Sequence, residues 1–243
     1  MSTIWLPPPE KRDDKPGAEC WPLVETAMTI KCVLFDLDGT FADTAADLHF
    51  ALNRVLAQVG REEISFEKVR PAVSHGSRAM LKVAFDIEPE DPGYIELQQQ
   101  FLHTYADNIA EFTKPFDGME SLIDELEARG IHWGIVTNKP AWLTDALMQQ
   151  LGLSQRASAI VSGDTTSHAK PHPEPILYAC RKTGIDPAQA LYVGDAVRDI
   201  EAGRNAGTKT LVALFGYLDE SDNPLAWQAD GQIRHPLEIL DWL

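Results

Sequence analysis

Short apolar runs that alternate with helical segments are the feature that most constrains the fold of this chain. The runs span residues 30–35, 131–136, 159–161, 190–193 and 210–215, and each is separated from the next by a segment with helical punctuation. Strands that alternate with helices form parallel sheets, because each helix carries the chain back to the end of the sheet where the previous strand began, so that the next strand runs in the same direction. We therefore predict an α/β fold with a doubly wound parallel sheet.

The apolar spacing also locates several helices. Met119, Leu122 and Leu126 share one face of a helix that Gly130 ends. A second helix begins among the prolines near residue 173 and ends at Gly184. Residues 237–243 predict a short apolar helix that packs the C-terminus onto the core.

Residues 44–113 interrupt the strand pattern with helical stripes. The stripes are Leu48, Leu52, Val55, Leu56 and Val59, followed by Leu97, Phe101, Tyr105 and Ile109. We predict a helical cap over 44–113, inserted into an α/β core formed by residues 29–43 and 114–243. Hinge strands at 41–43 and 113–116 would join the two lobes, with a ligand cleft between them.

The first 28 residues show neither helical nor strand periodicity. They contain Pro7-Pro8-Pro9 and a mixed-charge run, a composition that predicts a disordered leader. Met28 stands directly before the first strand and is a candidate alternative start.

Charge and cysteine content exclude several classes of function. The net charge of -16 disfavours binding to nucleic acid and to anionic membranes. Cys20, Cys32 and Cys180 lack metal-site or disulfide-framework spacing. With no apolar run long enough to span a membrane and no signal-peptide pattern, we expect a cytoplasmic protein. We expect it to be a monomer or a homodimer.

Polar residues follow the predicted strands, where ligands of an open parallel sheet bind. They come from separate segments: Asp36 and Asp38, Thr137 and Asn138, Lys170, and Asp195 with Asp199. Two acids at this spacing, followed by Gly39 and Thr40, suit a nucleophile and a proton donor around a phosphate-binding turn. By itself such a stretch is more often an ordinary turn.

The later acids and the lysine have structural alternatives. Asp195 is a candidate N-cap of the next helix and Asp199 a first-turn charge. Together with Asp36 they would form a hard oxygen site suited to Mg²⁺. Lys170 is either a solvated surface residue or the cation that balances a bound phosphate, with the Thr137 hydroxyl on the same oxygens.

The order DxDGT, TN, KP and GD-x3-D resembles the haloacid dehalogenase-like superfamily over residues 30–243. Residues 35–40, 136–140, 170–175 and 192–200 resemble its phosphoglycolate phosphatase family. The resemblance implies a Rossmann-like core, a helical cap, and Mg²⁺-dependent hydrolysis of a small phosphorylated metabolite. Phe41-Ala42 stand where that family commonly has Leu-Val, a departure that affects the hinge.

The resemblance also implies a role for each motif residue. Asp36 would be the nucleophile that accepts the phosphoryl group, and Asp38 the acid that protonates the leaving oxygen and then activates water. The metal would be held by Asp36, the Asp38 carbonyl and Asp195, with Asp199 nearby. The phosphoryl group would be bound by Thr137, Asn138, Lys170 and the turn at Gly39 and Thr40.

We expect residues of the predicted cap to determine which substrate is bound. Arg78 lies in a polar interruption at 74–78 and is a candidate for binding a substrate carboxylate, whereas Ser77 could simply cap the next helix. Residues 74–80, 133–136 and the segment from 216 to 237 resemble the N-acetylmuramic acid 6-phosphate phosphatases of peptidoglycan recycling. The expected substrate is therefore either that sugar phosphate or 2-phosphoglycolate.

Other functions remain as alternatives. A sugar phosphomutase of the same superfamily shares all four motifs, and a haloacid dehalogenase would have no need for the acid at Asp38. A catalytically idle interaction protein would need none of these residues. His103, His168 and His172 lack a metal-binding helical spacing and are expected to be structural or solvent-facing.

Overall fold

Six parallel strands form the central sheet in the computed structural model, which describes residues 29–243. The strands follow the order β5-β4-β1-β6-β7-β8. From β1 at the centre the chain moves outward to β5, returns beside β1 with β6, and moves outward to β8 on the other side. This is the predicted doubly wound arrangement, and the leader predicted at 1–28 lies outside the described residues. The strands are β1 (Cys32–Phe35), β4 (His132–Val136), β5 (Ala159–Val161), β6 (Ala190–Gly194), β7 (Lys209–Ala213) and β8 (Gly231–Ile233).

Helices cover both faces of the sheet, which explains why the inner strands are apolar throughout. Val33 and Phe35 of β1 pack into one core cluster with side chains of α5 and α6 and with Ile239. Cys32 and Leu34 face the opposite side and pack with side chains of α7 and α8. The helices are α5 (Met119–Ala128), α6 (Ala141–Gln150), α7 (Glu174–Thr183) and α8 (Val197–Ala206).

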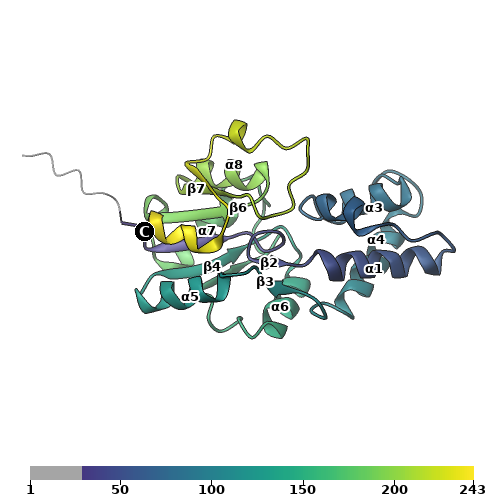
Figure 1. The fold of residues 1–243 in the computed structure, drawn as a ribbon, viewed down its shortest axis with the longest axis horizontal. Helices are drawn as coiled ribbons and strands as arrows, with labels where there is room; N and C mark the ends of the chain where they lie inside the picture. The colour runs from purple at the N-terminus through teal and green to yellow at the C-terminus, as the bar shows by residue number, and fades with distance from the viewer. Residues whose placement is uncertain (1–28) are drawn as a thin grey trace, which may run out of the picture.

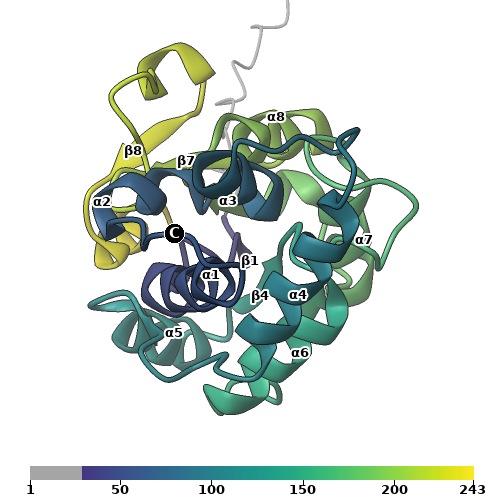
Figure 2. The same ribbon diagram turned by 90° about the vertical axis from the view of Figure 1, so that its right-hand side faces the viewer.

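A helical insertion, residues 44–113, projects from one end of the sheet (Figures 1 and 2). It lies between two short strands that pair in antiparallel fashion, β2 (Ala42–Asp43) and β3 (Lys114–Pro115). The predicted stripes are buried except that Val59 is exposed and Leu97 only half-buried. That the insertion acts as a separate cap domain stays a prediction. Its helices are α1 (Ala45–Gln58), α2 (Phe66–Val69), η1 (Arg70–Ala72), α3 (Gly76–Phe85) and α4 (Tyr94–Ala106).

The C-terminal third differs from the prediction in detail. The strand expected at 210–215 ends at Ala213, because the Gly216 N–H turns back to the Ala213 carbonyl. The sequence pattern missed β8, whose three residues are too few to show a period. The tail forms a 3₁₀-helix, η4 (Pro236–Trp242), and its Ile239 is buried. Shorter 3₁₀ turns are η2 (Pro187–Gln189) and η3 (Pro224–Trp227).

Two cysteines of residues 29–243, Cys32 and Cys180, are buried and unbridged. Burial raises the pKa of the Cys32 thiol to about 12, so it stays protonated. Within the same residues, no helix is both long enough and apolar enough to cross a bilayer.

Candidate active site

The carboxyl ends of β1, β4 and β6 lie side by side at the edge of the sheet that faces the helical insertion. β1 is in register with both neighbouring strands as far as Phe35. Asp36, Thr137 and Asp195 directly follow these three strands, so they emerge at the same edge. Lys170 reaches them from the loop between β5 and α7. The convergence predicted from the sequence is therefore present.

The Lys170 side chain is fully buried between two carboxylates. Its Nζ lies 2.9 Å from Asp36 Oδ1 and 2.8 Å from Asp199 Oδ1. It also donates a 2.9 Å hydrogen bond to the Tyr192 hydroxyl. A buried ammonium needs such partners to offset its lost hydration. Lys170 is thus a fixed cation of the site and not the solvated surface residue that was the alternative.

Asn138 fixes the main chain that carries this lysine. Its side-chain amide donates to the Lys170 carbonyl, and its side-chain oxygen accepts from the Lys170 N–H, both at 2.9 Å. The two contacts join the loop after β4 to the loop before α7. Asn138 therefore sets the position of this lysine.

Asp36 is held as a carboxylate by its neighbours. Burial by itself would raise the pKa of Asp36, but the charges of Lys170 and Arg198 outweigh it and lower that pKa below its usual value. The Leu37 N–H donates to Asp36 Oδ1 at 2.7 Å and adds to the effect. An ionised, partly desolvated carboxylate is a suitable nucleophile.

Asp195 is the acid of this group that lacks a cationic partner. Its carboxylate accepts hydrogen bonds from Ser74 Oγ at 2.5 Å, the Tyr217 N–H at 2.9 Å and Thr40 Oγ1 at 3.4 Å. None of the lysines and arginines in the described chain forms an ion pair with it. Burial, followed by the charges of Asp199 and Asp36, raises the pKa of Asp195 to about 7.

These acids form a group that fits a divalent cation. Carboxylate oxygens of Asp36, Asp195 and Asp199 all lie within 4.8 Å of one another, and all three residues are buried. Hard oxygen donors of this kind are the ligands that Mg²⁺ prefers. A cation at this place would offset both the burial and the neighbouring negative charges that raise the pKa of Asp195.

Gly39 is required where the turn after β1 passes Asp195. Its φ is +84°, and a Cβ at this position would lie 2.2 Å from Asp195 Oδ2. The N–H groups of Gly39 and Thr40 donate within the turn, to the carbonyls of Ala42 and Leu37. The glycine thus allows the turn to approach the acid cluster closely.

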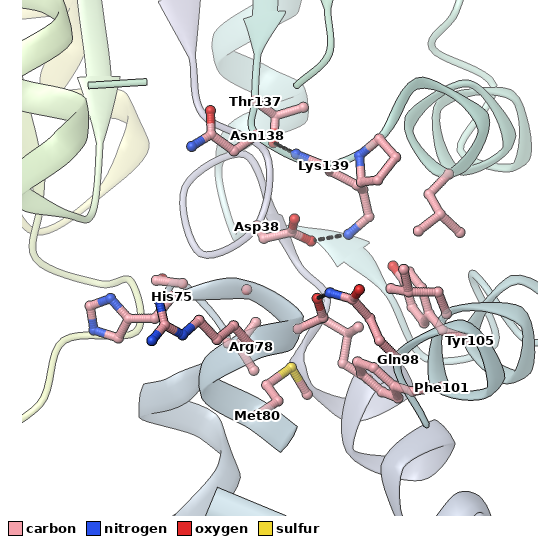
Figure 3. A pocket seen from close by; sticks show the side chains of 18 of the residues that line it. Asp38, His75, Arg78, Met80, Gln98, Phe101, Tyr105, Thr137, Asn138 and Lys139 are labelled. Carbon is pink, nitrogen blue, oxygen red and sulfur yellow. Dashed lines mark hydrogen bonds and ion pairs between the residues drawn. The ribbon is translucent and has the colours of Figure 1, made fainter. Parts of the chain in front are cut away.

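Asp38 lines the cavity, where its carboxylate faces Lys139 (Figure 3). Its Oδ1 lies 2.6 Å from Lys139 Nζ and accepts a 2.6 Å hydrogen bond from Thr44 Oγ1. Neither Lys139 nor Thr44 was predicted from the sequence as a site residue. Asp36 and Asp38 therefore have separate environments, each with its own lysine.

A cavity of about 490 Å³ lies between this edge of the sheet and the helical insertion. Asp36, Asp38 and Thr137 face it from the core, and Arg78 faces it from α3. Lys170, Asp195, Asp199, Gly39 and Thr40 do not line it. Its remaining walls are formed by Leu48, Val73, Ser74, His75, Gly76, Ser77, Met80, Gln98, Phe101, Leu102, Tyr105, Asn138, Lys139, Pro140, Leu143 and Arg198.

The helix-capping alternatives are only partly correct. Ala196, not Asp195, is the N-cap of α8, and Asp199 accepts a 3.0 Å hydrogen bond from the Ala196 N–H as a first-turn acid does. α3 begins after His75, so Ser77 lies inside the helix and is not its cap. Asp199 thus has two contacts at once, one with the helix and one with Lys170.

Arg198 is a further residue that sequence reasoning missed. It is next to Asp199 in the last motif, and it donates a hydrogen bond to the Ser74 carbonyl of the helical insertion. Its position inside the GD-x3-D motif was the available signal. His103, His168 and His172 are exposed, as predicted.

Comparison with known proteins agrees with this geometry. Residues 33–213 match the family model of haloacid dehalogenase-like hydrolases. The N-acetylmuramic acid 6-phosphate phosphatase of Pseudomonas aeruginosa is 42% identical over 216 residues, which are 89% of this chain and 96% of that protein. The phosphoglycolate phosphatase of Xylella fastidiosa (strain 9a5c) is 44% identical over 208 residues, 85% of this chain and 90% of that protein.

A solved structure shows the same fold. The crystal structure of a predicted phosphoglycolate phosphatase from Haemophilus somnus 129PT has a TM-score of 0.78 to this protein, at 26% identity. The match covers 88% of this chain and 97% of that one. The match therefore includes both the central sheet and the helical insertion of this protein.

Proposed function

We propose a specific reaction for this chain, which belongs to the haloacid dehalogenase-like hydrolase family and is a phosphatase of small phosphorylated metabolites. In this proposal it hydrolyses a carboxylate-bearing phosphomonoester through an aspartyl phosphate intermediate, with Mg²⁺ bound. One observation carries the proposal. Three separate segments bring Asp36 with Asp38, Lys170, and Asp195 to one sheet edge beside a cavity of about 490 Å³.

The first half of the proposed reaction transfers the phosphoryl group to the protein. The Asp36 carboxylate attacks phosphorus in line, and the bond between phosphorus and the leaving oxygen breaks. Asp38 gives its proton to that oxygen, so the product leaves as an alcohol. Lys170, Asn138 and the Thr137 hydroxyl are proposed to hold the phosphoryl oxygens and orient the nucleophile.

The second half restores the free enzyme. Asp38, now a carboxylate, takes a proton from water as the water oxygen attacks phosphorus. The bond between phosphorus and Asp36 breaks, and inorganic phosphate leaves. The covalent intermediate divides one slow hydrolysis into two faster steps.

Asp36, Asp195 and the main-chain carbonyl of Asp38 are proposed to hold Mg²⁺, with Asp199 nearby. The bound ion would supply positive charge against the phosphoryl oxygens. The lack of a cationic partner for Asp195 supports this assignment. Asp199, paired with Lys170 at 2.8 Å, keeps the lysine in place.

The size and lining of the cavity favour the sugar phosphate as substrate. A two-carbon phosphoester would fill a small part of 490 Å³, a volume within the usual range for larger ligands. Met80, Phe101 and Leu102 offer apolar surface for methyl groups. Arg78 offers donors for a carboxylate, and the side-chain oxygen of Gln98 offers an acceptor for an amide N–H. We propose N-acetylmuramic acid 6-phosphate as the preferred substrate, which would place the enzyme in cytoplasmic peptidoglycan recycling and carbohydrate metabolism.

The test is phosphate release by the purified protein with Mg²⁺. We expect a higher kcat/KM for N-acetylmuramic acid 6-phosphate than for 2-phosphoglycolate, and no release by Asp36→Asn. The reverse preference would overturn the sugar-phosphate assignment alone. Turnover that depends on added glucose 1,6-bisphosphate would indicate the phosphomutase, and no turnover of any phosphomonoester would indicate the idle interaction protein.

A further inference from the structure

We infer that Lys139 is a positioning residue for Asp38 and leaves one oxygen of its carboxylate available to the leaving group. The inference rests on the proposed function of Asp38 as the proton donor. It concerns a residue that none of the four sequence motifs selected.

The main chain of Lys139 is fixed on both sides by hydrogen bonds. Its N–H donates to Thr137 Oγ1 at 3.2 Å, and its carbonyl accepts from the Gly163 N–H at 2.9 Å. Pro140 follows and restricts the chain as it enters α6. The lysine therefore starts from a well-defined point at the end of β4.

The side chain of Lys139 is buried and faces the cavity. Only 6% of it is exposed, and Nζ lies 2.6 Å from Asp38 Oδ1. The ammonium also lies 4.8 Å from the centre of the Tyr105 ring on α4, close enough for a cation–π contact. Lys139 thus touches both the core acid and the helical insertion (Figure 3).

Both donors to Asp38 use the same carboxylate oxygen. Lys139 Nζ, from the loop after β4, and Thr44 Oγ1, at the start of α1, each reach Oδ1 at 2.6 Å. Two contacts on Oδ1 set the rotation of the carboxylate and leave Oδ2 for the transferred proton. Thr44 by itself would fix the oxygen but not the plane of the group.

The division of work between the two lysines follows from their partners. Lys170 contacts Asp36 and Asp199, and it does not line the cavity. Lys139 contacts Asp38 and does line it. One lysine therefore serves the nucleophile, and the other serves the proton donor.

The experiment uses the dependence of rate on the leaving group. An alkyl phosphate leaves as an alkoxide and needs the proton of Asp38, whereas p-nitrophenyl phosphate leaves as a stable anion and needs it far less. The value of kcat/KM covers only the steps up to loss of the leaving group, so hydrolysis of the aspartyl phosphate does not enter. Lys139→Met keeps the length of the side chain and removes the charge.

The alkyl phosphate in this test is whichever of N-acetylmuramic acid 6-phosphate and 2-phosphoglycolate the wild type prefers. We expect Lys139→Met to lower kcat/KM about 10²-fold for that substrate. For p-nitrophenyl phosphate we expect kcat/KM to fall less than about threefold. Lys139→Arg keeps the charge and should recover part of the lost rate. In an Asp38→Asn background, Lys139→Met should add little, because the group that it positions is already gone. Lys182→Met, at an exposed position on α7, is the matched control.

Equal losses on both substrates would overturn the inference, because a residue that only binds phosphate or supports the fold does not distinguish leaving groups. No loss on either substrate would overturn it as well. Thermal unfolding of Lys139→Met and Lys139→Arg shows whether a loss reflects folding. If the wild type hydrolyses neither substrate, the proposed function falls and this inference falls with it.

Discussion

The core side and the insertion side of the cavity hold their charges in opposite ways. On the core side, Lys170 and Lys139 pair with carboxylates at 2.6–2.9 Å, and their side chains are at most 6% exposed. On the insertion side, Arg78 pairs with Glu88 at 3.0 Å, with 64% of the Arg78 side chain exposed. Buried pairs are costly to rearrange, whereas an exposed pair contributes little and exchanges partners readily.

This difference separates chemistry from selection. The core arranges its charges before any ligand enters, which is what phosphoryl transfer requires of its surroundings. The insertion presents an arginine that can exchange Glu88 for a ligand carboxylate. Substitutions on the core side should therefore change kcat, and those on the insertion side should change KM.

The largest expected effect is at the nucleophile. Asp36→Asn keeps the shape of the side chain but removes the charge that attacks phosphorus, so we expect turnover and covalent phosphorylation both to fall below detection. Lys170 would keep its contact with Asp199, which should preserve the fold. Phosphate release and intact-protein mass measurement check this prediction. Near-normal turnover would show that the core side does not perform the chemistry.

The next effect is at the proton donor. Asp38→Asn removes the transferable proton but retains an oxygen for Lys139 and Thr44. We expect kcat to fall roughly 10²–10⁴-fold, with KM nearly unchanged. Steady-state kinetics on the preferred phosphomonoester measure both values. A rise in KM with unchanged kcat would instead indicate that Asp38 binds the substrate and does not donate the proton.

A smaller effect links Mg²⁺ to pH through Asp195. Without metal, the pKa of Asp195 is about 7 in the folded protein, compared with the usual aspartate pKa of 3.8 in the unfolded chain. Between these two pH values the folded protein therefore holds a proton that the unfolded chain has released. The contribution of Asp195 to the stability of the metal-free protein should therefore fall as the pH rises from about 4 to 7. Because Mg²⁺ must displace this proton, its apparent dissociation constant should rise by up to about tenfold for each pH unit below 7.

Metal-induced shifts in unfolding temperature at several pH values test this linkage. Asp195→Asn has no proton to displace and should show a weak shift that varies little with pH. Subtracting its profile from that of the wild type isolates Asp195 from the histidines. A wild-type shift that is independent of pH would contradict the assignment of Asp195 as a ligand.

The core side could be predicted from the sequence because its residues follow the strands directly. Asp36, Thr137 and Asp195 each come one residue after a buried strand, and parallel strands bring their carboxyl ends to one edge. Lys139 follows the same strand as Thr137, but its partner Asp38 is 101 residues away. Nothing in the residues around Lys139 marks this contact, so only the structure reveals it.

Contacts between the insertion and the core were not predictable for the same reason. Ser74 reaches Asp195 across 121 residues, and Tyr217 donates its N–H to the same carboxylate from the loop after β7. Serine and tyrosine have no periodic signal that would mark them as partners of a buried acid. The helical periodicity predicted the elements of the insertion, but not which residues of its loops meet the sheet.

The smallest expected effect is at Arg78, on the insertion side of the cavity, where a substitution tests whether this side selects the substrate. Arg78→Ala should raise KM about three- to tenfold, the loss expected for one hydrogen-bonded contact to a ligand carboxylate, and leave kcat unchanged. Glu88→Gln weakens the competing ion pair at 3.0 Å and should lower KM, the opposite direction. Steady-state kinetics of both variants on the preferred substrate measure the pair. If both variants keep the wild-type KM, Arg78 only stabilises α3 through Glu88, and selection must depend on the apolar wall formed by Met80, Phe101 and Leu102.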